Sequence, residues 1–293
     1  MKSIARRHPI GVFLTIAYGA SAAIFAIPLL SSTGLGIIDL ELPGMAPFIL
    51  LSAISLAVAA FITTAMVEGR AGVRDLRRRL LHFRVHIGWY ALALLLLPAT
   101  AFAAAVVLAG LEPVSALLAN PGTLAVVIVG AIVAFVLVNW WEETGWTGFV
   151  LERLQPRIGP IRASIVTTWL QAIIHLPLVF VAGGVTDSRV PAEQIPFYLV
   201  ALFVLPISVR LVLTWLYNSA DRSLPIVGLY HAGLGVATGT GFLPVLAPDV
   251  NPAWAYAAFA VLAAAVLVAT RGRLGFQATE PGVRIQGQVA MAS

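Results

Sequence analysis

The chain has 293 residues, of which 60% are hydrophobic and only 11% are charged. Soluble globular proteins have roughly 25% charged residues, so this composition excludes an ordinary soluble domain and favours a polytopic membrane protein. The formal net charge of +5 would suggest nucleic acid in a soluble chain. Here the basic residues lie in short loops between apolar runs, which predicts membrane lipids as partners and no nucleic acid.

A membrane-spanning helix needs about 20 mostly apolar residues, and eight runs in the chain meet this length. The first run is longer than the apolar part of a signal peptide, so we interpret it as a retained anchor. The sequence therefore predicts an all-α polytopic membrane protein with about eight transmembrane helices. The runs cover residues 9–31, 45–67, 86–110, 122–149, 160–182, 195–217, 224–245 and 252–270.

The charged residues between these runs predict the orientation. Arginines gather before the first run and after the second, fourth, sixth and eighth runs. The alternate loops hold Asp39, Glu41, Glu112, Asp187, Glu193 and Asp249, with Arg189 as their one basic residue. Because positive residues favour the cytoplasmic side, we expect both termini in the cytoplasm and a multi-pass protein of the cell's inner (plasma) membrane.

Two segments differ from this pattern of spans and loops. The stretch from Gly69 to Arg84 is basic with interspersed leucines, which is typical of an amphipathic segment lying on the inner leaflet. The tail 275–293 is polar, and we predict a disordered cytoplasmic tail. Residues 1–274 then form a single transmembrane domain.

Ionisable side chains inside spans are costly and indicate functional sites. The candidates are Glu142, Glu143, His175, Arg210 and His231. A rise of about 1.5 Å per residue puts Glu142 roughly 15 Å from the inner face, with both histidines in the same half or near the middle. We therefore expect the glutamates and histidines to meet in one water-filled cavity that opens to the cytoplasm.

Three segments carry a resemblance to a known family. They read WWEETGWTGFVLERLQPR, WLQAIIHLPLVF and WLYNSADRSLPIVGLYHAGLG, in that order. They resemble the three motifs of the CPBP family, the CAAX prenyl endopeptidase and bacteriocin-processing group of intramembrane proteases, also called the Abi family. The similarity implies a CPBP-like core over about residues 120–270.

The resemblance implies an intramembrane endopeptidase (a hydrolase) that uses water as its nucleophile. Glu142 and His175 would hold and activate that water, and His231 would stabilise the oxyanion. Glu143 would orient the site. General-base catalysis by a carboxylate and donation from an imidazole are chemically consistent with these roles.

The chain departs from the family pattern at three positions. Thr147 replaces an arginine, Gln171 replaces an aromatic residue, and Gly235 replaces an asparagine. We hypothesise that Arg210 supplies the missing positive charge from another helix; the alternative is that Arg210 reaches the lipid head groups. Gln171 lies one helical turn before His175, and we hypothesise that it donates a hydrogen bond to Glu142.

A metal cofactor is a separate question. The chain has no cysteine and no HExxH helix, which is the strong signal for a zinc hydrolase. We favour a mechanism with no cofactor. Zinc is the alternative, with Glu142, His175 and His231 as its ligands.

Three functions fit these residues. The first is an endopeptidase that cleaves a peptide or membrane-protein substrate. The second is a catalytically inactive relative that binds membrane partners, as a bacteriocin immunity protein would. The third is a proton-coupled transporter, which we rank last because the sequence has no detectable internal repeat.

Overall fold

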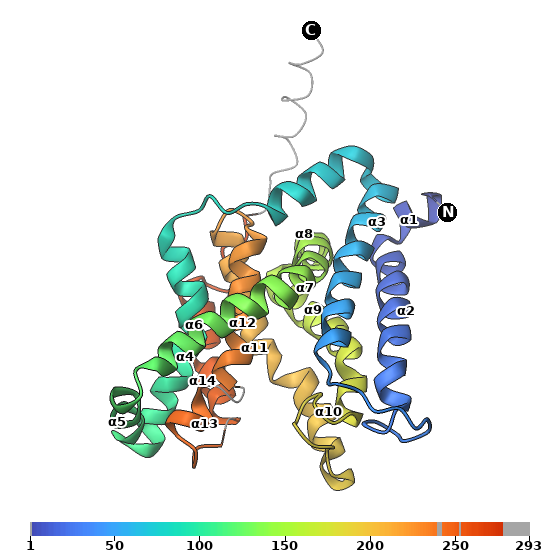
Figure 1. Ribbon diagram of the computed structural model, residues 1–293. Helices are drawn as coiled ribbons and strands as arrows, with labels where there is room; N and C mark the ends of the chain where they lie inside the picture. The colour runs from blue at the N-terminus through green and yellow to red at the C-terminus, as the bar shows by residue number, and fades with distance from the viewer. Residues whose placement is uncertain (1, 239–241, 252, 278–293) are drawn as a thin grey trace.

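The computed structural model describes residues 2–238, 242–251 and 253–277. Every regular element within these ranges is helical, and seven of the helices there are long and apolar enough to cross a membrane. The predicted all-α polytopic fold is confirmed (Figure 1). The spans match the apolar runs because backbone groups in lipid must be satisfied within the helix itself.

The first half of the chain forms three long helices and two short ones before the central span begins. Its elements are α1 (Lys2–Arg7), α2 (Pro9–Leu30), α3 (Ala46–Leu80), α4 (Ile87–Ala109), α5 (Glu112–Ala119) and α6 (Gly122–Ala134).

The second half carries the candidate site. Its elements are η1 (Phe135–Asn139), α7 (Trp140–Gly145), η2 (Trp146–Leu151), α8 (Glu152–Ile158), α9 (Pro160–His175), η3 (Leu176–Phe180), η4 (Ala192–Gln194), α10 (Ile195–Val204), α11 (Pro206–Ser219), α12 (Leu224–Thr238), α13 (Leu243–Leu246) and α14 (Ala253–Ala269). Helix α14 corresponds to the eighth predicted run and is shorter than the others, at 17 residues.

The two ends of the described chain lie at the same end of the bundle. Helices α1 and α8 both lie at the top of Figure 1. Asn218 donates hydrogen bonds to the Leu274 carbonyl at 2.9 Å and to Gln155 of α8 at 2.8 Å. The chain therefore crosses the bundle an even number of times, as eight predicted spans require. Residues 278–293 of the predicted disordered tail lie outside the described residues.

Helix α3 changes direction at Gly69. The backbone there has φ of 65° and ψ of −152°, a left-handed conformation that glycine adopts readily. The first part of α3 runs along the bundle, and the part after Gly69 arches across its top (Figure 1). Leu76 and Leu80 are buried there, whereas Arg70 and Arg74 are exposed. This segment has the amphipathic character predicted from its sequence.

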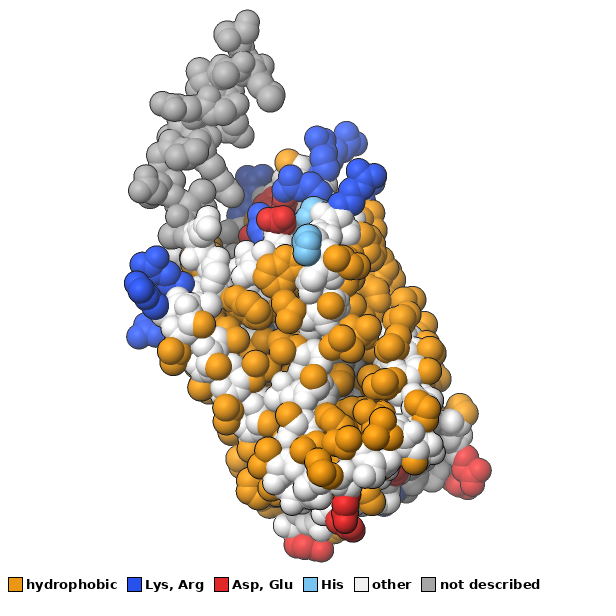
Figure 2. Space-filling model, turned by 90° about the vertical axis from the view of Figure 1, so that its left-hand side faces the viewer, with side chains coloured by type: hydrophobic (Ala, Val, Ile, Leu, Met, Phe, Trp, Pro, Cys, Tyr) orange, Lys and Arg blue, Asp and Glu red, His pale blue; other side chains and the backbone are white. Residues whose placement is uncertain are grey.

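The face in Figure 2 shows the expected distribution of charge. Lysine and arginine side chains gather toward the upper end, acidic side chains mark the lower end, and hydrophobic side chains lie between them. We call the upper end, which carries Arg70, Arg74 and Arg77, the basic face. This arrangement is that of a membrane-spanning protein whose apolar band contacts lipid.

The central span carries the glutamates into the protein interior. Elements α6, η1, α7, η2 and α8 form one continuous helix in which two π-helical stretches flank α7. Val126, Val129 and Val133 on α6 are exposed, as expected for a lipid-facing helix. All residues from Glu142 to Leu151 are buried. A π-helical turn shifts the faces of a helix relative to each other and often marks a functional site.

Glycines allow this central span to pack closely against its neighbours. A Cβ atom on Gly145 would lie 3.2 Å from side-chain atoms of Phe13 and Leu56. A Cβ atom on Gly228 of α12 would lie 3.0 Å from the Trp140 Cα atom. Small residues permit such close approach between membrane helices, so these contacts fix α7 against α2, α3 and α12.

Candidate active site

Glu143 is the most completely satisfied polar residue of the site. Arg210 on α11 donates to both of its carboxylate oxygens, from Nη1 at 2.7 Å and from Nη2 at 3.0 Å. The Thr147 hydroxyl also donates to Glu143, and His231 Nδ1 lies 2.8 Å from it. A carboxylate offers about four acceptor positions, so Glu143 has no oxygen left for a substrate.

Arg210 lies where the sequence hypothesis puts it, against the glutamate pair. Its side chain is 4% exposed and that of Glu143 is 0% exposed. A head-group position for Arg210 is therefore wrong. Arg210 Nη1 also donates to Thr147 Oγ1 at 3.0 Å, so threonine at the family's arginine position acts as a hydrogen-bonding partner of an arginine from another helix.

The other glutamate, Glu142, has a different environment. It is buried, but it forms no hydrogen bond with the described residues. His175 Nε2 lies 3.9 Å from Oε1, and His231 Nδ1 lies 3.8 Å from Oε2. Adjacent residues on one helix turn thus hold two carboxylates in contrasting surroundings. Such a contrast is typical of like groups that have different roles, and Glu142 is the carboxylate of the two that has no hydrogen-bond partner among the described residues.

The hydrogen bonds of the two histidines define their ring nitrogens. His175 Nδ1 lies 2.9 Å from the Gln171 carbonyl oxygen, which can only accept, so Nδ1 carries a proton. His231 Nδ1 donates in the same way to the ionised Glu143. These tautomers are assigned from the network of partners. The Nε2 atom of each ring forms no hydrogen bond with the described residues and is left to contact water or a substrate.

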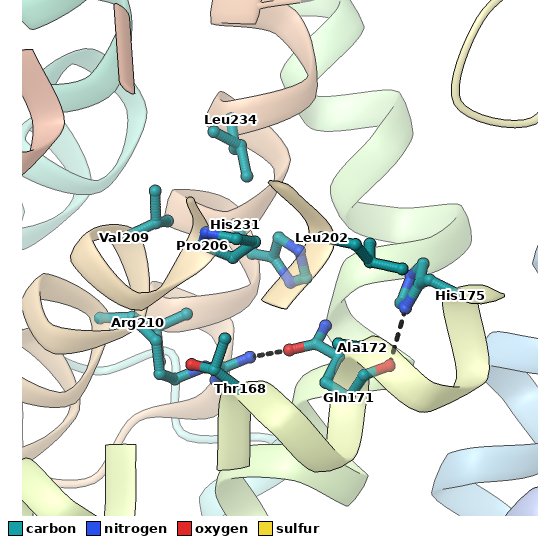
Figure 3. Close-up of a pocket in the computed structure, with 11 residues that line it drawn as sticks. Thr168, Gln171, Ala172, His175, Leu202, Pro206, Val209, Arg210, His231 and Leu234 are labelled. Atoms are coloured by element: carbon teal, nitrogen blue, oxygen red, sulfur yellow. Dashed lines mark hydrogen bonds between the residues drawn. The ribbon is translucent and has the colours of Figure 1, made fainter. Parts of the chain in front are cut away.

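Gln171 does not donate to Glu142, contrary to the sequence hypothesis. Its side-chain oxygen accepts a hydrogen bond from Arg210 Nη2 instead (Figure 3). The charged guanidinium is a strong donor that binds the amide oxygen and orients the amide toward Arg210, and no hydrogen bond joins the amide NH2 group to Glu142 among the described residues. The backbone carbonyl of Gln171 meanwhile orients His175.

Gly235 contributes no side chain at the family's asparagine position. It is exposed, and a Cβ atom built there would meet nothing within 4 Å. The helix α12 therefore brings His231 to the site without the second donor that the family pattern places one turn later.

The site borders a cavity of about 170 Å³ between α9, α10, α11 and α12. Gln171, His175, Arg210 and His231 form its polar wall (Figure 3). Thr168 and apolar side chains, including Leu202, complete the lining. Liquid water occupies about 30 Å³ per molecule, so the cavity has room for several waters or a part of a peptide.

The cavity lies at some depth from the basic face. Helices α9 and α12 start at that face, and the lining residues on α12, His231 and Leu234, lie in its later turns. Trp146 and Phe149, which follow the glutamates toward the basic face, are 0% exposed. Both rings pack against Phe13 of α2, so they do not line the cavity, and its opening to the cytoplasm stays a prediction.

An ionic layer lies on the basic side of the site, and sequence analysis missed it. Arg79 is buried and donates to the Gly148 carbonyl in η2 at 2.8 Å and to the Tyr217 hydroxyl at 3.0 Å. Tyr217 in turn donates to Glu152 at 2.8 Å. These bonds tie the amphipathic end of α3 to the π-helical turn after the glutamates. The position of Arg79 between Leu76 and Leu80 was its only signal in the sequence.

The described residues contain no group of three or more histidine, aspartate or glutamate side chains placed to hold a metal ion. His231 Nδ1 is engaged by Glu143, which removes one nitrogen from the zinc ligand set considered from sequence. Zinc lies about 2.0–2.2 Å from the nitrogen and oxygen atoms that bind it. Hydrogen bonds from neighbouring residues hold those ligands in place.

Comparison with known proteins agrees with the motifs. Residues 124–237 match the family model described as type II CAAX prenyl endopeptidase Rce1-like. Residues 124–237 are therefore called the Rce1-like segment. This Rce1-like segment contains both glutamates, both histidines and Arg210, and it confirms the resemblance to the CAAX protease family. No curated protein matches the chain.

Proposed function

We propose that this multi-pass membrane protein is an intramembrane endopeptidase that hydrolyses a peptide bond of a membrane-associated substrate with a water activated by Glu142 and His175. One observation carries the proposal: Glu142 faces two histidines at the edge of a cavity, while Glu143 is occupied by Arg210. The arrangement provides Glu142 as a carboxylate base with no arginine partner, and it places the imidazole rings of His175 and His231 next to this base.

Water activation follows from the distances around Glu142. Its Oε1 atom and His175 Nε2 are 3.9 Å apart, a separation at which one water contacts both groups. Glu142 takes a proton from this water as its oxygen attacks the carbonyl carbon of the peptide. The same proton then passes to the amide nitrogen when the C–N bond breaks, which releases a carboxylate and an amine. General acid–base catalysis of this kind contributes roughly 10²- to 10⁴-fold.

His231 is the remaining donor for the oxyanion. Its Nδ1 proton is committed to Glu143, so Nε2 donates to a substrate only when the ring is an imidazolium. Glu142 Oε2 and Glu143 Oε1 lie 3.8 Å and 2.8 Å from His231 Nδ1. Arg210 balances the charge of Glu143.

The alternative is a protein of the same fold that binds membrane partners without cleaving them. Gly235 favours this reading, because no side chain stands at the family's asparagine position. Loss of one oxyanion donor costs on the order of 100- to 1000-fold in rate. The protein would be a slow peptidase if His231 alone stabilises the oxyanion well enough for cleavage. It would be a binding protein if His231 alone does not.

We would test the proposal by comparing the polypeptide termini in membranes that contain wild type or Glu142→Gln at equal levels. The matched control is Glu193→Gln, because Glu193 is an exposed glutamate outside the candidate site. New termini should appear with wild type and Glu193→Gln and disappear with Glu142→Gln. Identical termini in all three membranes, with a phenotype retained by Glu142→Gln, would favour the binding protein.

A further inference from the structure

A groove lies beside the bend of α3 at the basic face (Figure 1). It has a volume of about 410 Å³ and is lined by Ala65, Gly69, Arg70, Val73, Arg74 and Arg77. The three arginines follow the bend at a spacing of four and then three residues, so they share one face of the helix. All three are exposed. The groove therefore presents three guanidinium groups to one occupant.

The groove arginines form no ion pair or side-chain hydrogen bond with the described residues, and the acids nearest to them in the sequence are engaged elsewhere. Asp75 accepts hydrogen bonds from Arg78 at 2.6 Å and from Arg79 at 2.9 Å. Glu68 pairs with Arg153 of α8. The sequence has no other acid between the bend and the start of α4. The positive charge of the groove is thus left for an external anion.

The position of the groove along α3 matches the boundary between lipid hydrocarbon and head groups. The part of α3 from Ala46 to Gly69 is roughly 34 Å long at about 1.5 Å per residue, and the hydrocarbon core of a bilayer is about 30 Å thick. Val58 and Ile62 are 48% and 43% exposed. Ala65 follows them on the same helix face and lines the groove. An apolar, lipid-facing row therefore leads directly to the three arginines.

We infer that the groove binds an anionic phospholipid of the adjoining leaflet, with its phosphate held by Arg70, Arg74 and Arg77 and its acyl chains beside Val58 and Ile62. Guanidinium groups bind phosphate oxygens through paired hydrogen bonds. A soluble phosphate would use the arginines alone and would not contact the apolar row. A diffuse attraction of anionic membranes for basic residues would involve the other exposed arginines of the basic face equally. Binding of this lipid does not depend on the peptidase proposal.

The helix face opposite the groove is joined to the candidate site. Arg79 lies on that face and donates to the Gly148 carbonyl at 2.8 Å and to the Tyr217 hydroxyl at 3.0 Å. Leu76 and Leu80 are buried in the same segment. A lipid in the groove therefore stabilises the part of α3 that is tied to η2. A ligand that binds only the folded state raises the melting temperature, which provides a readout without any cleavage assay.

The test is thermal unfolding of the purified protein in detergent micelles that contain phosphatidylcholine, with or without phosphatidylglycerol. The groove variant combines Arg70→Gln, Arg74→Gln and Arg77→Gln. The matched control removes the same charge from three exposed arginines at the same end of the bundle by combining Arg157→Gln, Arg162→Gln and Arg273→Gln. Soluble glycerol phosphate replaces phosphatidylglycerol in a further sample. Melting in phosphatidylcholine alone shows that each variant is folded.

Phosphatidylglycerol at about 100 times its dissociation constant should raise the melting temperature of wild type by roughly 5–10 °C. The control variant should show the same rise, and the groove variant should show none. The inference would be overturned if wild type shows no rise, or if both variants respond alike, which would indicate diffuse attraction. An equal rise with glycerol phosphate would also overturn it, because a soluble anion would then be the ligand.

A single change keeps the test decisive if the groove variant does not fold. Arg74 lies between the other two groove arginines, and Arg74→Gln should need about five-fold more phosphatidylglycerol for half of the rise, from the contribution of one basic residue at an anionic surface. Arg157→Gln should need the same amount as wild type. Equal requirements for Arg74→Gln and Arg157→Gln would contradict a site in the groove.

Discussion

Arg210→Met tests the pairing on which the site depends. Arg210 provides two of the four hydrogen bonds to Glu143 and one to Thr147, with both partners of the ion pair almost fully buried. Methionine keeps much of the volume and removes the charge. Breaking a buried ion pair by removing one partner costs about 3–5 kcal/mol, because the other charge stays buried and unpaired.

The double variant Arg210→Met with Glu143→Gln separates loss of charge balance from loss of packing. Removing both charges of a buried pair is often neutral or stabilising, so the double variant should recover most of the lost stability. The assay is thermal unfolding in detergent followed by tryptophan fluorescence, because the chain has seven tryptophans. The single variant should melt on the order of 10 °C lower, from roughly 2–4 °C per kcal/mol for a chain of this size.

The exposed Arg74→Met is the control, and it should change stability by less than about 0.5 kcal/mol. The reasoning would be refuted if Arg210→Met unfolds like the control. It would also be refuted if the double variant loses as much stability as the two single changes added together, because additive losses indicate that the two residues do not interact.

Three further predictions follow from the same geometry. Gly228→Ala should lose about 1–3 kcal/mol, because its Cβ would press on the Trp140 backbone, whereas Gly235→Ala should gain up to about 1 kcal/mol in an open position; equal melting temperatures would contradict the packing. Gly235→Asn restores a donor one turn after His231 and should raise kcat/KM up to about 100-fold; an unchanged or lower rate would exclude a donor role at that position. EDTA should leave peptide cleavage unchanged, since Glu142 is assigned as the base, and loss of cleavage that zinc restores would assign the water to a metal.

The spans could be predicted because lipid imposes a length on every helix. The run predicted over 9–31 is observed as Pro9–Leu30, and the run over 86–110 is observed as Ile87–Ala109. The break at Gly69 and the two π-helical stretches around α7 were not predicted. They depend on packing between helices, and a hydropathy pattern contains no information about such packing.

The site was predicted in part. Intramembrane charges are few, so a lone arginine and a glutamate pair could be matched by charge and depth alone. The partner of Gln171 could not be chosen this way, because one residue four positions from a histidine can face either Glu142 or Arg210. Arg79 was read as one member of a basic run, since burial between two leucines is visible only once the helix has bent across the basic face.

The most direct test of the account measures cleavage by the purified protein in liposomes. Fluorogenic peptides with apolar side chains are supplied, and wild type is compared with Glu142→Gln after both have been shown to melt at the same temperature. The account predicts that kcat/KM falls by roughly 10²- to 10⁴-fold in Glu142→Gln, which is the contribution of a general base. Cleavage at the same rate by both proteins would contradict the role of Glu142 and with it the proposed mechanism.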